Sequence, residues 1–278
     1  MADPDPLERA ADAVDDAIDE LTGVPTDDGD IERFTASGMT LVAEAGGPEQ
    51  SETTFVLVHG IGMGRKVFAD LALRLVGSAR VIAVDLPGYG DAPEPPRTPT
   101  IERNADLIAA YLRKIDRGPV VLLGHSMGTQ VATEVAARHP EMVDRLILVA
   151  PTVDRHHRRA LTQLIRLGID LLDESPKVLL LGAREYLRAG PHLRRKMTAM
   201  LTHRPERAYP RVSAPTLVIR GEGDRVSPRG WCAEVVAGLP DARAVEIPGH
   251  GHETLIRDAA PAAEAIRHFL ATTSGRPE

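Results

Sequence analysis

A pentapeptide near the middle of the chain places a serine where it could act as a nucleophile. It reads Gly124-His125-Ser126-Met127-Gly128, between the apolar run 120–123 and the Ala/Val-rich stretch 129–138. The run predicts a buried strand and the stretch a helix, so Ser126 would occupy the turn between them. So tight a turn needs neighbours almost without side chains, which the two glycines provide. We expect an exposed hydroxyl with the Met127 N–H beside it, a nucleophile and half of an oxyanion hole.

Two later strand-to-loop junctions supply candidates for the acid and the base that such a serine needs. The run 216–219 precedes a loop that contains Glu222 and Asp224. The run 244–247 precedes a loop that contains His250 and His252. Both runs are typical of strands, but their spacing leaves open which acid and which histidine would serve.

A glycine-rich loop at 59–64 follows the apolar run 55–58. A dinucleotide-binding fold would need G-x-G-x-x-G here and an acid after the next strand, where Asp85 stands. Arg65 occupies the third glycine position, however, and would obstruct close packing of the helix on the sheet. A plain glycine turn and a loop that supplies an oxyanion donor are the other interpretations.

In order along the chain, these features resemble the α/β-hydrolase family: a glycine loop, a D-x-P-G sequence at Asp85, the G-x-S-x-G turn, an acid and a histidine. The resemblance implies Ser126 as the nucleophile. The family's strand-G-x-x-D-x-x-x-P pattern implies Asp224 as the acid, with Glu222 as the alternative. The G-x-G-H pattern implies His252 as the base, with His250 as the alternative.

The resemblance also implies an oxyanion hole made by the backbone N–H groups of Ile61 and Met127. Asp85 precedes the nucleophile, whereas the family's acid follows it, so a structural role is expected for Asp85. Asp91 stands where the family often has a serine. His59 and His125 each flank a glycine turn, and we expect them to act as supporting hydrogen-bonding groups.

The expected fold is an α/β-hydrolase fold, a mostly parallel eight-stranded sheet with helices on both faces. A hairpin at 31–35 and 39–44 would form one edge. Residues 31–151 and 211–278 would form the core, and the helical periodicity of 152–210 predicts a cap inserted after the sixth strand. Residues 1–30 would form an acidic N-terminal helical extension.

Charge is unevenly distributed along the chain. Residues 1–30 contain eleven acidic side chains and one arginine, whereas 152–210 contain twelve basic and six acidic ones. The acidic extension would either dock on the basic cap or leave the cap free to attract anionic substrates.

Composition limits the function classes. A net charge of −7 argues against nucleic-acid binding, which needs a basic face, and no apolar run is long enough to span a membrane. Cys232 is the single cysteine, which excludes an intrachain disulfide and favours a reducing, cytoplasmic location. No cofactor is implied, and the His250/His252 pair lacks a third metal ligand at suitable spacing. The oligomeric state stays open.

We therefore predict a serine hydrolase that cleaves a small carboxylic ester or lactone through an acyl-enzyme. C–C bond hydrolysis, perhydrolysis and acyl transfer use the same three residues and stay as alternatives. A non-catalytic ligand-binding protein of the same fold is the alternative from another class. Because the expected nucleophile is a serine and not an aspartate, the resemblance argues against haloalkane dehalogenase or epoxide hydrolase activity.

Overall fold

One eight-stranded sheet organises the computed structural model, which describes residues 30–158, 192–256 and 258–273. The strand order is β1-β2-β4-β3-β5-β6-β7-β8. β1 pairs antiparallel with β2, and β2 with β4, whereas every other pair is parallel. The strands are β1 Asp30–Ala36, β2 Met39–Gly46, β3 Thr54–Val58, β4 Arg80–Asp85, β5 Val120–His125, β6 Val143–Val149, β7 Thr216–Gly221 and β8 Ala242–Ile247. The predicted fold class and the edge hairpin are confirmed.

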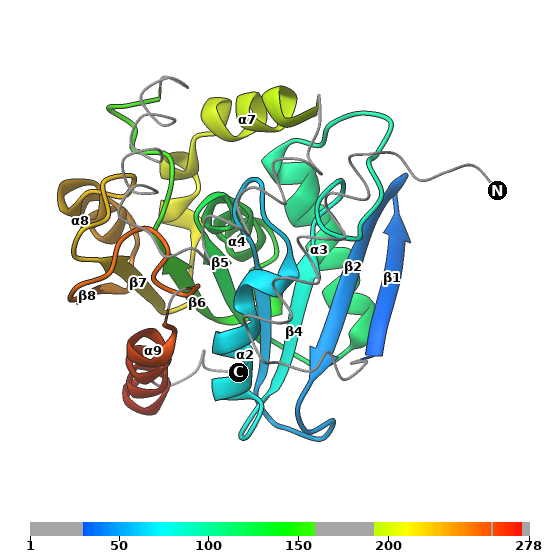
Figure 1. The fold of residues 1–278 in the computed structure, drawn as a ribbon, viewed down its shortest axis with the longest axis horizontal. Helices are drawn as coiled ribbons and strands as arrows, with labels where there is room; N and C mark the ends of the chain where they lie inside the picture. Colours follow the sequence, from blue (N-terminus) through cyan, green and yellow to red (C-terminus); the bar gives the residue numbers. More distant parts are fainter. Residues whose placement is uncertain (1–29, 159–191, 257, 274–278) are drawn as a thin grey trace.

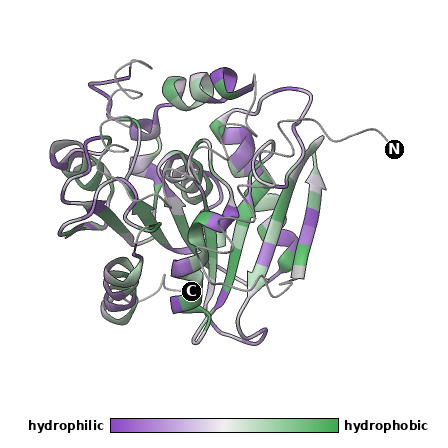
Figure 2. Ribbon diagram, in the orientation of Figure 1, coloured by the Kyte–Doolittle hydropathy of each residue, from purple (hydrophilic) through white to green (hydrophobic). Residues whose placement is uncertain are grey.

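Helices cover both faces of the sheet (Figure 1). Alternate residues of β3 and β5 enter different cores, because successive side chains of a strand point to opposite faces. Val56 and Leu122 pack with α3, α4 and α8, whereas Leu57 and Leu123 pack with α2 and α9. Figure 2 shows the central strands as predominantly hydrophobic. The α-helices are α2 Ala69–Leu75, α3 Ile101–Ile115, α4 Met127–Arg138, α7 Leu193–Thr202, α8 Arg229–Gly238 and α9 Ala260–Thr272, and the 3-10 turns are Arg65–Phe68, Pro140–Met142, Pro205–Arg207 and Tyr209–Arg211.

A local signal explains where α3 begins. The Thr100 side chain accepts a hydrogen bond from the Arg103 N–H at 3.3 Å and caps α3, as its position before the apolar-periodic stretch predicts. The segment after the glycine loop begins as a 3-10 turn at Arg65 and becomes α-helical at Ala69.

The parallel strands place their carboxyl ends along one edge of the sheet, where ligands bind in open α/β folds. The loops after β3, β4, β5, β7 and β8 therefore meet there. Ser126, Asp224 and His252 lie in these loops, and Ile61 lies in the loop after β3.

The predicted cap at 152–210 is described only at 152–158 and 192–210, and its segment 159–191 lies outside the described residues. The buried Lys196 of α7 donates to Glu94 Oε2 at 2.7 Å and lies 4.3 Å from the centre of the Tyr89 ring. Gln130 of α4 donates to the carbonyl of Met200 at 3.1 Å. α7 thus packs on the loop after β4 and on α4 (Figure 1).

The expected extension at 1–30 also lies outside the described residues, apart from Asp30. The proposed docking of that extension on the cap stays a prediction. No helix in the described part of the chain is long and apolar enough to cross a bilayer.

Candidate active site

Ser126 stands on a strained turn between β5 and α4. Its φ of 53° and ψ of −120° are a conformation that a residue with a side chain adopts only when its surroundings enforce it. The backbone on both sides enforces it here: the Ser126 N–H donates to the Val149 carbonyl at 2.9 Å, and the Thr129 N–H donates to the Ser126 carbonyl at 2.9 Å. The turn therefore holds the serine hydroxyl at the carboxyl end of β5.

The two glycines of the pentapeptide are required by close backbone contacts. A Cβ at Gly124 would lie 2.3 Å from the Gly128 carbonyl oxygen, and a Cβ at Gly128 would lie 2.1 Å from the Val58 carbonyl oxygen. Neither neighbour is the movable end of a side chain. Any larger residue would push α4 away from β3 and β5 and displace the serine.

Ser126, His252 and Asp224 form one hydrogen-bonded row. His252 Nε2 lies 3.0 Å from Ser126 Oγ, and His252 Nδ1 lies 3.0 Å from Asp224 Oδ2. The three residues are 7%, 6% and 2% exposed. An ionised Asp224 accepts a hydrogen bond from the Nδ1–H group of His252. The lone pair of Nε2 therefore faces the serine hydroxyl. The structure thus brings together the three residues that the resemblance implied.

The carboxylate of Asp224 is divided between two tasks. Oδ1 accepts from the N–H groups of Val226 at 2.8 Å and Ser227 at 2.7 Å, and Oδ2 faces the imidazole. Burial by itself would raise the pKa of Asp224, but the neighbouring His252, the Ser227 amide and the charge of Arg220 hold that pKa below its ordinary value. The carboxylate therefore stays ionised beside the imidazole.

The two alternative residues lie in the same loops but have other contacts. Glu222 accepts from the Gly249 N–H at 3.1 Å through Oε2. Its carboxylate therefore supports the loop 248–252 after β8, called the histidine loop below, instead of the imidazole. The His250 carbonyl accepts from the Gly223 N–H at 2.8 Å. Both contacts fasten the loop 222–228 after β7, called the acid loop below, to the histidine loop.

The loop after β3 packs directly on the nucleophile. A Cβ at Gly60 would lie 3.0 Å from Ser126 Cβ, so the next residue, Ile61, begins beside the serine. Met127 is the first residue of α4, and the first N–H groups of a helix have no partner within it. The two backbone N–H groups that the resemblance implied thus belong to a residue of the loop that packs on Ser126 and to the residue that follows Ser126 in the chain.

His59 and His125 are buried and hydrogen-bonded to backbone. His59 Nε2 accepts from the Leu86 N–H at 3.1 Å, which leaves Nδ1 to donate to the Gly60 carbonyl at 2.7 Å. Burial lowers the pKa of His59, so this ring is neutral. His125 Nε2 lies 3.0 Å from the His252 carbonyl, and burial together with nearby His252 lowers the pKa of His125 to about 4. A neutral His125 donates this bond and holds the backbone of His252.

Asp85 has a structural set of contacts. Its carboxylate accepts from the Arg65 N–H at 2.6 Å, from the Arg65 guanidinium and from the Asp91 N–H at 3.0 Å. Arg65 also donates to Glu44 at 2.6 Å and to Asp91 at 2.7 Å. Asp91, at a position where the family often has a serine, therefore serves as a third carboxylate around one buried guanidinium.

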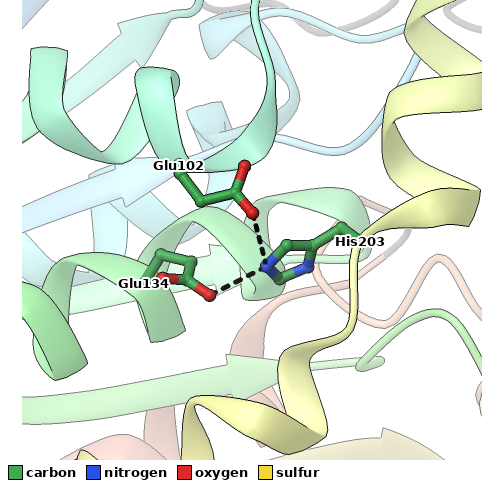
Figure 3. Close-up of side chains that lie close together, drawn as sticks. All are labelled: Glu102, Glu134 and His203. Carbon is green, nitrogen blue, oxygen red and sulfur yellow. Dashed lines mark hydrogen bonds and ion pairs between the residues drawn. The ribbon is translucent and has the colours of Figure 1, made fainter.

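One cluster in the described part of the chain has the composition of a metal site: Glu102 of α3, Glu134 of α4 and His203 after α7 (Figure 3). His203 Nε2 lies 2.9 Å from Glu134 and 4.0 Å from Glu102. Coordination through Nε2 would put the ring proton on Nδ1, which is buried without a hydrogen-bond partner. Metal-bound histidines normally donate that proton. We interpret the contact as an Nε2–H donor to Glu134 that joins α7 to the core.

Cys232 is buried in α8, and its surroundings make its thiol unreactive. Burial, with the nearby charge of Asp224, raises the pKa of the Cys232 thiol to about 12. The thiol therefore stays protonated, and Cys232 serves as a packing residue of α8.

Arg220 is a residue beside the triad that the motifs did not single out. It stands in β7, whose other residues are all buried, and its guanidinium reaches into the acid loop. A charged side chain inside a buried strand, just before a functional loop, is the signal that could have identified it.

The chain is similar to known hydrolases over most of its length. Residues 55–265 match the family described as the alpha/beta hydrolase family. A 2-(acetamidomethylene)succinate hydrolase of Mesorhizobium japonicum is 28% identical over 76% of this chain and 86% of its own length. A pimeloyl-[acyl-carrier protein] methyl ester esterase of Xanthomonas oryzae pv. oryzae is 30% identical over 78% of this chain and 94% of its own length. The fold is also that of a thermophilic esterase from Thermogutta terrifontis, with a TM-score of 0.71, 24% identity and coverage of 87% and 98% of the two chains.

Proposed function

Because the chain belongs to the alpha/beta hydrolase family, we propose that it hydrolyses a carboxylic ester or lactone with Ser126 as nucleophile, His252 as general base and Asp224 as its acid partner. The unbroken row from the Ser126 hydroxyl through both ring nitrogens of His252 to Asp224 carries this proposal. The relatives that are similar over most of this chain are named a hydrolase and a methyl ester esterase, which supports it.

The first half of the reaction acylates the serine. His252 Nε2 takes the proton of Ser126 as Oγ attacks the ester carbonyl, and Asp224 stabilises the imidazolium that forms. The N–H groups of Ile61 and Met127 receive the developing oxyanion. When the tetrahedral intermediate collapses, the C–O bond to the alcohol breaks, and His252 returns its proton to the leaving oxygen.

The second half releases the acid by the same chemistry in reverse. Water takes the place of the alcohol, gives a proton to His252 Nε2 and attacks the acyl carbon. Collapse of the second intermediate breaks the bond to Ser126 Oγ, which recovers its proton from the imidazolium. No group beyond the triad and the two backbone donors is needed for this sequence.

The substrate class proposed is an aliphatic or small ester or lactone. The chain has four tyrosines, four phenylalanines and one tryptophan, so an aromatic-lined acyl pocket is not expected. C–C hydrolysis, perhydrolysis and acyl transfer, which the same triad can perform, are alternatives that a substrate panel separates.

We also propose that residues 152–210 cover this site as a cap. The contacts of Lys196 with Glu94 and Tyr89 support that proposal, because they join α7 to the loop after β4 at the sheet edge that carries Ser126. The cytoplasmic location predicted from the single cysteine belongs to the same proposal, and the buried, protonated Cys232 is consistent with it.

Labelling by a fluorophosphonate tests the proposal most directly, because this probe phosphonylates a serine that its histidine activates. We expect covalent modification of Ser126, found by peptide mass spectrometry, together with hydrolysis of short-chain p-nitrophenyl esters. Ser126→Ala should abolish both, whereas Ser213→Ala, which removes an exposed hydroxyl before β7, should leave labelling in place. A folded wild-type protein that is neither labelled nor active on any ester would instead favour a non-catalytic binding protein.

A further inference from the structure

Arg220 is a buried cation whose hydrogen bonds are directed mainly to backbone. It is 6% exposed and is the next-to-last residue of β7. Nε donates to the Ser227 carbonyl at 3.1 Å, and Nη2 donates to the carbonyls of Glu222 and Asp224, each at 3.1 Å. Nη1 donates to Glu246. A buried guanidinium persists only when its donors are satisfied, and three of these bonds end on the loop that presents Asp224.

The planar guanidinium determines the path of that loop. The three carbonyls belong to Glu222, Asp224 and Ser227, so they are spread along the acid loop. The stretch 222–227 therefore wraps around one rigid group. Arginine suits this task because its donors lie in one plane at fixed angles, whereas a lysine ammonium is a single point of charge. None of these four bonds uses the Asp224 carboxylate, which is left to two amides and to His252.

The same guanidinium connects the acid loop to the strand that carries the histidine loop. Glu246 lies on β8, one residue before that strand ends at Ile247. Next to it, the Glu222 N–H donates to the Ile247 carbonyl at 2.9 Å. A Cβ at Gly221 would lie 2.2 Å from the Gly251 carbonyl oxygen, so the two loops pack backbone against backbone. A change in the acid loop would therefore reach both members of the Asp224–His252 pair.

We propose that Arg220 is a positioning residue of this hydrolase, which holds the acid loop so that Asp224 Oδ2 meets His252 Nδ1. The inference rests on the proposed function, because it assigns Arg220 to the same triad. Its role is exerted through Asp224, and Arg220 itself has no contact with the reacting atoms.

Arg229 provides a matched control. It pairs with the same Glu246, through Nε at 3.0 Å, but its side chain is 75% exposed and it belongs to the first turn of α8. Removal of Arg229 therefore changes the charge around Glu246 without touching the carbonyls of the acid loop. A comparison of the two arginines separates loop positioning from the general electrostatics of this edge.

The experiment compares Arg220→Met, Arg220→Lys and Arg229→Met in the full-length protein. Arg220→Met should lower kcat about 10- to 100-fold with KM changed less than about twofold, because misplacement of a catalytic group by about 1 Å costs this much. The low-field proton resonance of the His252 Nδ1–H···Asp224 hydrogen bond should be lost or shifted. Arg220→Lys should recover only part of the wild-type kcat and of the low-field resonance. Arg229→Met should match the wild type in both measurements.

A stability role alone would give a different result. Arg220→Met would then unfold at a lower temperature but keep the wild-type kcat and the low-field resonance while folded, and this outcome overturns the inference. Should Arg220→Met not fold, Arg220→Lys decides, since a wild-type kcat and resonance in that variant also overturn it. Failure of the proposed function is recognised separately: wild-type protein would not be labelled at Ser126, while the resonance would still report whether Arg220 positions Asp224.

Discussion

Two buried aspartates at the carboxyl ends of the strands each lie beside a buried arginine, and the two pairs serve opposite purposes. At the end of β4, the carboxylate of Asp85 accepts directly from the guanidinium of Arg65, and it also accepts from the N–H groups of Arg65 and Asp91. After β7, Asp224 receives a hydrogen bond from Arg220 of that strand only at its backbone carbonyl, which leaves its carboxylate for His252.

The comparison shows that the target of the arginine decides what the aspartate can do. A guanidinium placed on a carboxylate occupies the lone pairs that another donor would need, and the pair becomes a structural unit. A guanidinium placed on carbonyls fixes the backbone and still supplies a favourable field for the ionised carboxylate. Both aspartates are buried, but only Asp224 has an oxygen directed at an imidazole.

Among changes to the two aspartate–arginine pairs, Asp224→Asn should have the largest effect on kcat. The asparagine amide would donate to Nδ1, so the His252 proton would move to Nε2 and point at Ser126, where a lone pair is needed. We expect kcat for a short-chain p-nitrophenyl ester to fall by about 10⁴ with the fold intact, the loss that this tautomer change causes in a serine protease. A loss below about tenfold in a folded variant would contradict the assignment of Asp224 as the acid.

Asp85→Asn should reverse that pattern, with a loss of stability and little loss of activity. It removes the carboxylate that compensates the buried Arg65 and leaves Glu44 and the 39% exposed Asp91 as its ionic partners. Breaking a buried pair costs about 3 to 5 kcal/mol in the free energy of unfolding, which urea denaturation would measure. Asp91→Ser, the residue that the family often has there, should cost about 1 kcal/mol or less. A large drop in kcat for folded Asp85→Asn would show that this loop takes part in the chemistry.

The third prediction concerns pH and the histidine loop. The pKa of His125 is lowered from 6.5 to about 4 in the folded protein, so the unfolded chain binds the extra proton first as pH falls. The folded state therefore loses stability between about pH 6.5 and pH 4, by about 3 kcal/mol from this residue. His125→Gln keeps a donor for the His252 carbonyl but does not titrate, and its free energy of unfolding should fall less steeply.

The measurement for this prediction is a series of urea denaturation curves between pH 7 and pH 4. The exposed His268, changed to Gln, is the matched control and should follow the wild type. Equal slopes for wild type and His125→Gln would mean that His125 titrates alike in the folded and unfolded states, which contradicts a buried neutral ring.

Local patterns, with the resemblance that they carry, were sufficient to predict the fold and the place of the nucleophile, and they narrowed the acid and the base to two candidates each. Gly124, Gly128 and the flanking strand and helix signals are close in sequence, so their steric meaning can be read without coordinates. The structure supplies what they left open: whether Glu222 or Asp224 faces the imidazole depends on the loop path around Arg220. That path is set by contacts to backbone carbonyls, which every residue type offers and no motif records. The same limitation applies to Asp91, whose partner Arg65 is 26 residues away.

The smallest expected effect, and the sharpest test of the comparison, comes from Glu222→Gln. Glu222 is exposed and accepts from the Gly249 N–H, a contact that a glutamine oxygen can also make, so kcat should stay within about threefold of the wild type. Glu222→Ala, which lacks any acceptor, should lower the free energy of unfolding by about 1 kcal/mol because one loop-to-loop hydrogen bond is lost. Both acids are carboxylates of one short loop, so neither their chemical class nor their approximate position can explain a difference in kcat of about 10³ or more between Glu222→Gln and Asp224→Asn. The direction of the carboxylate explains it. A comparable loss of kcat in both variants would mean that the loop, and not Asp224 alone, supplies the acid.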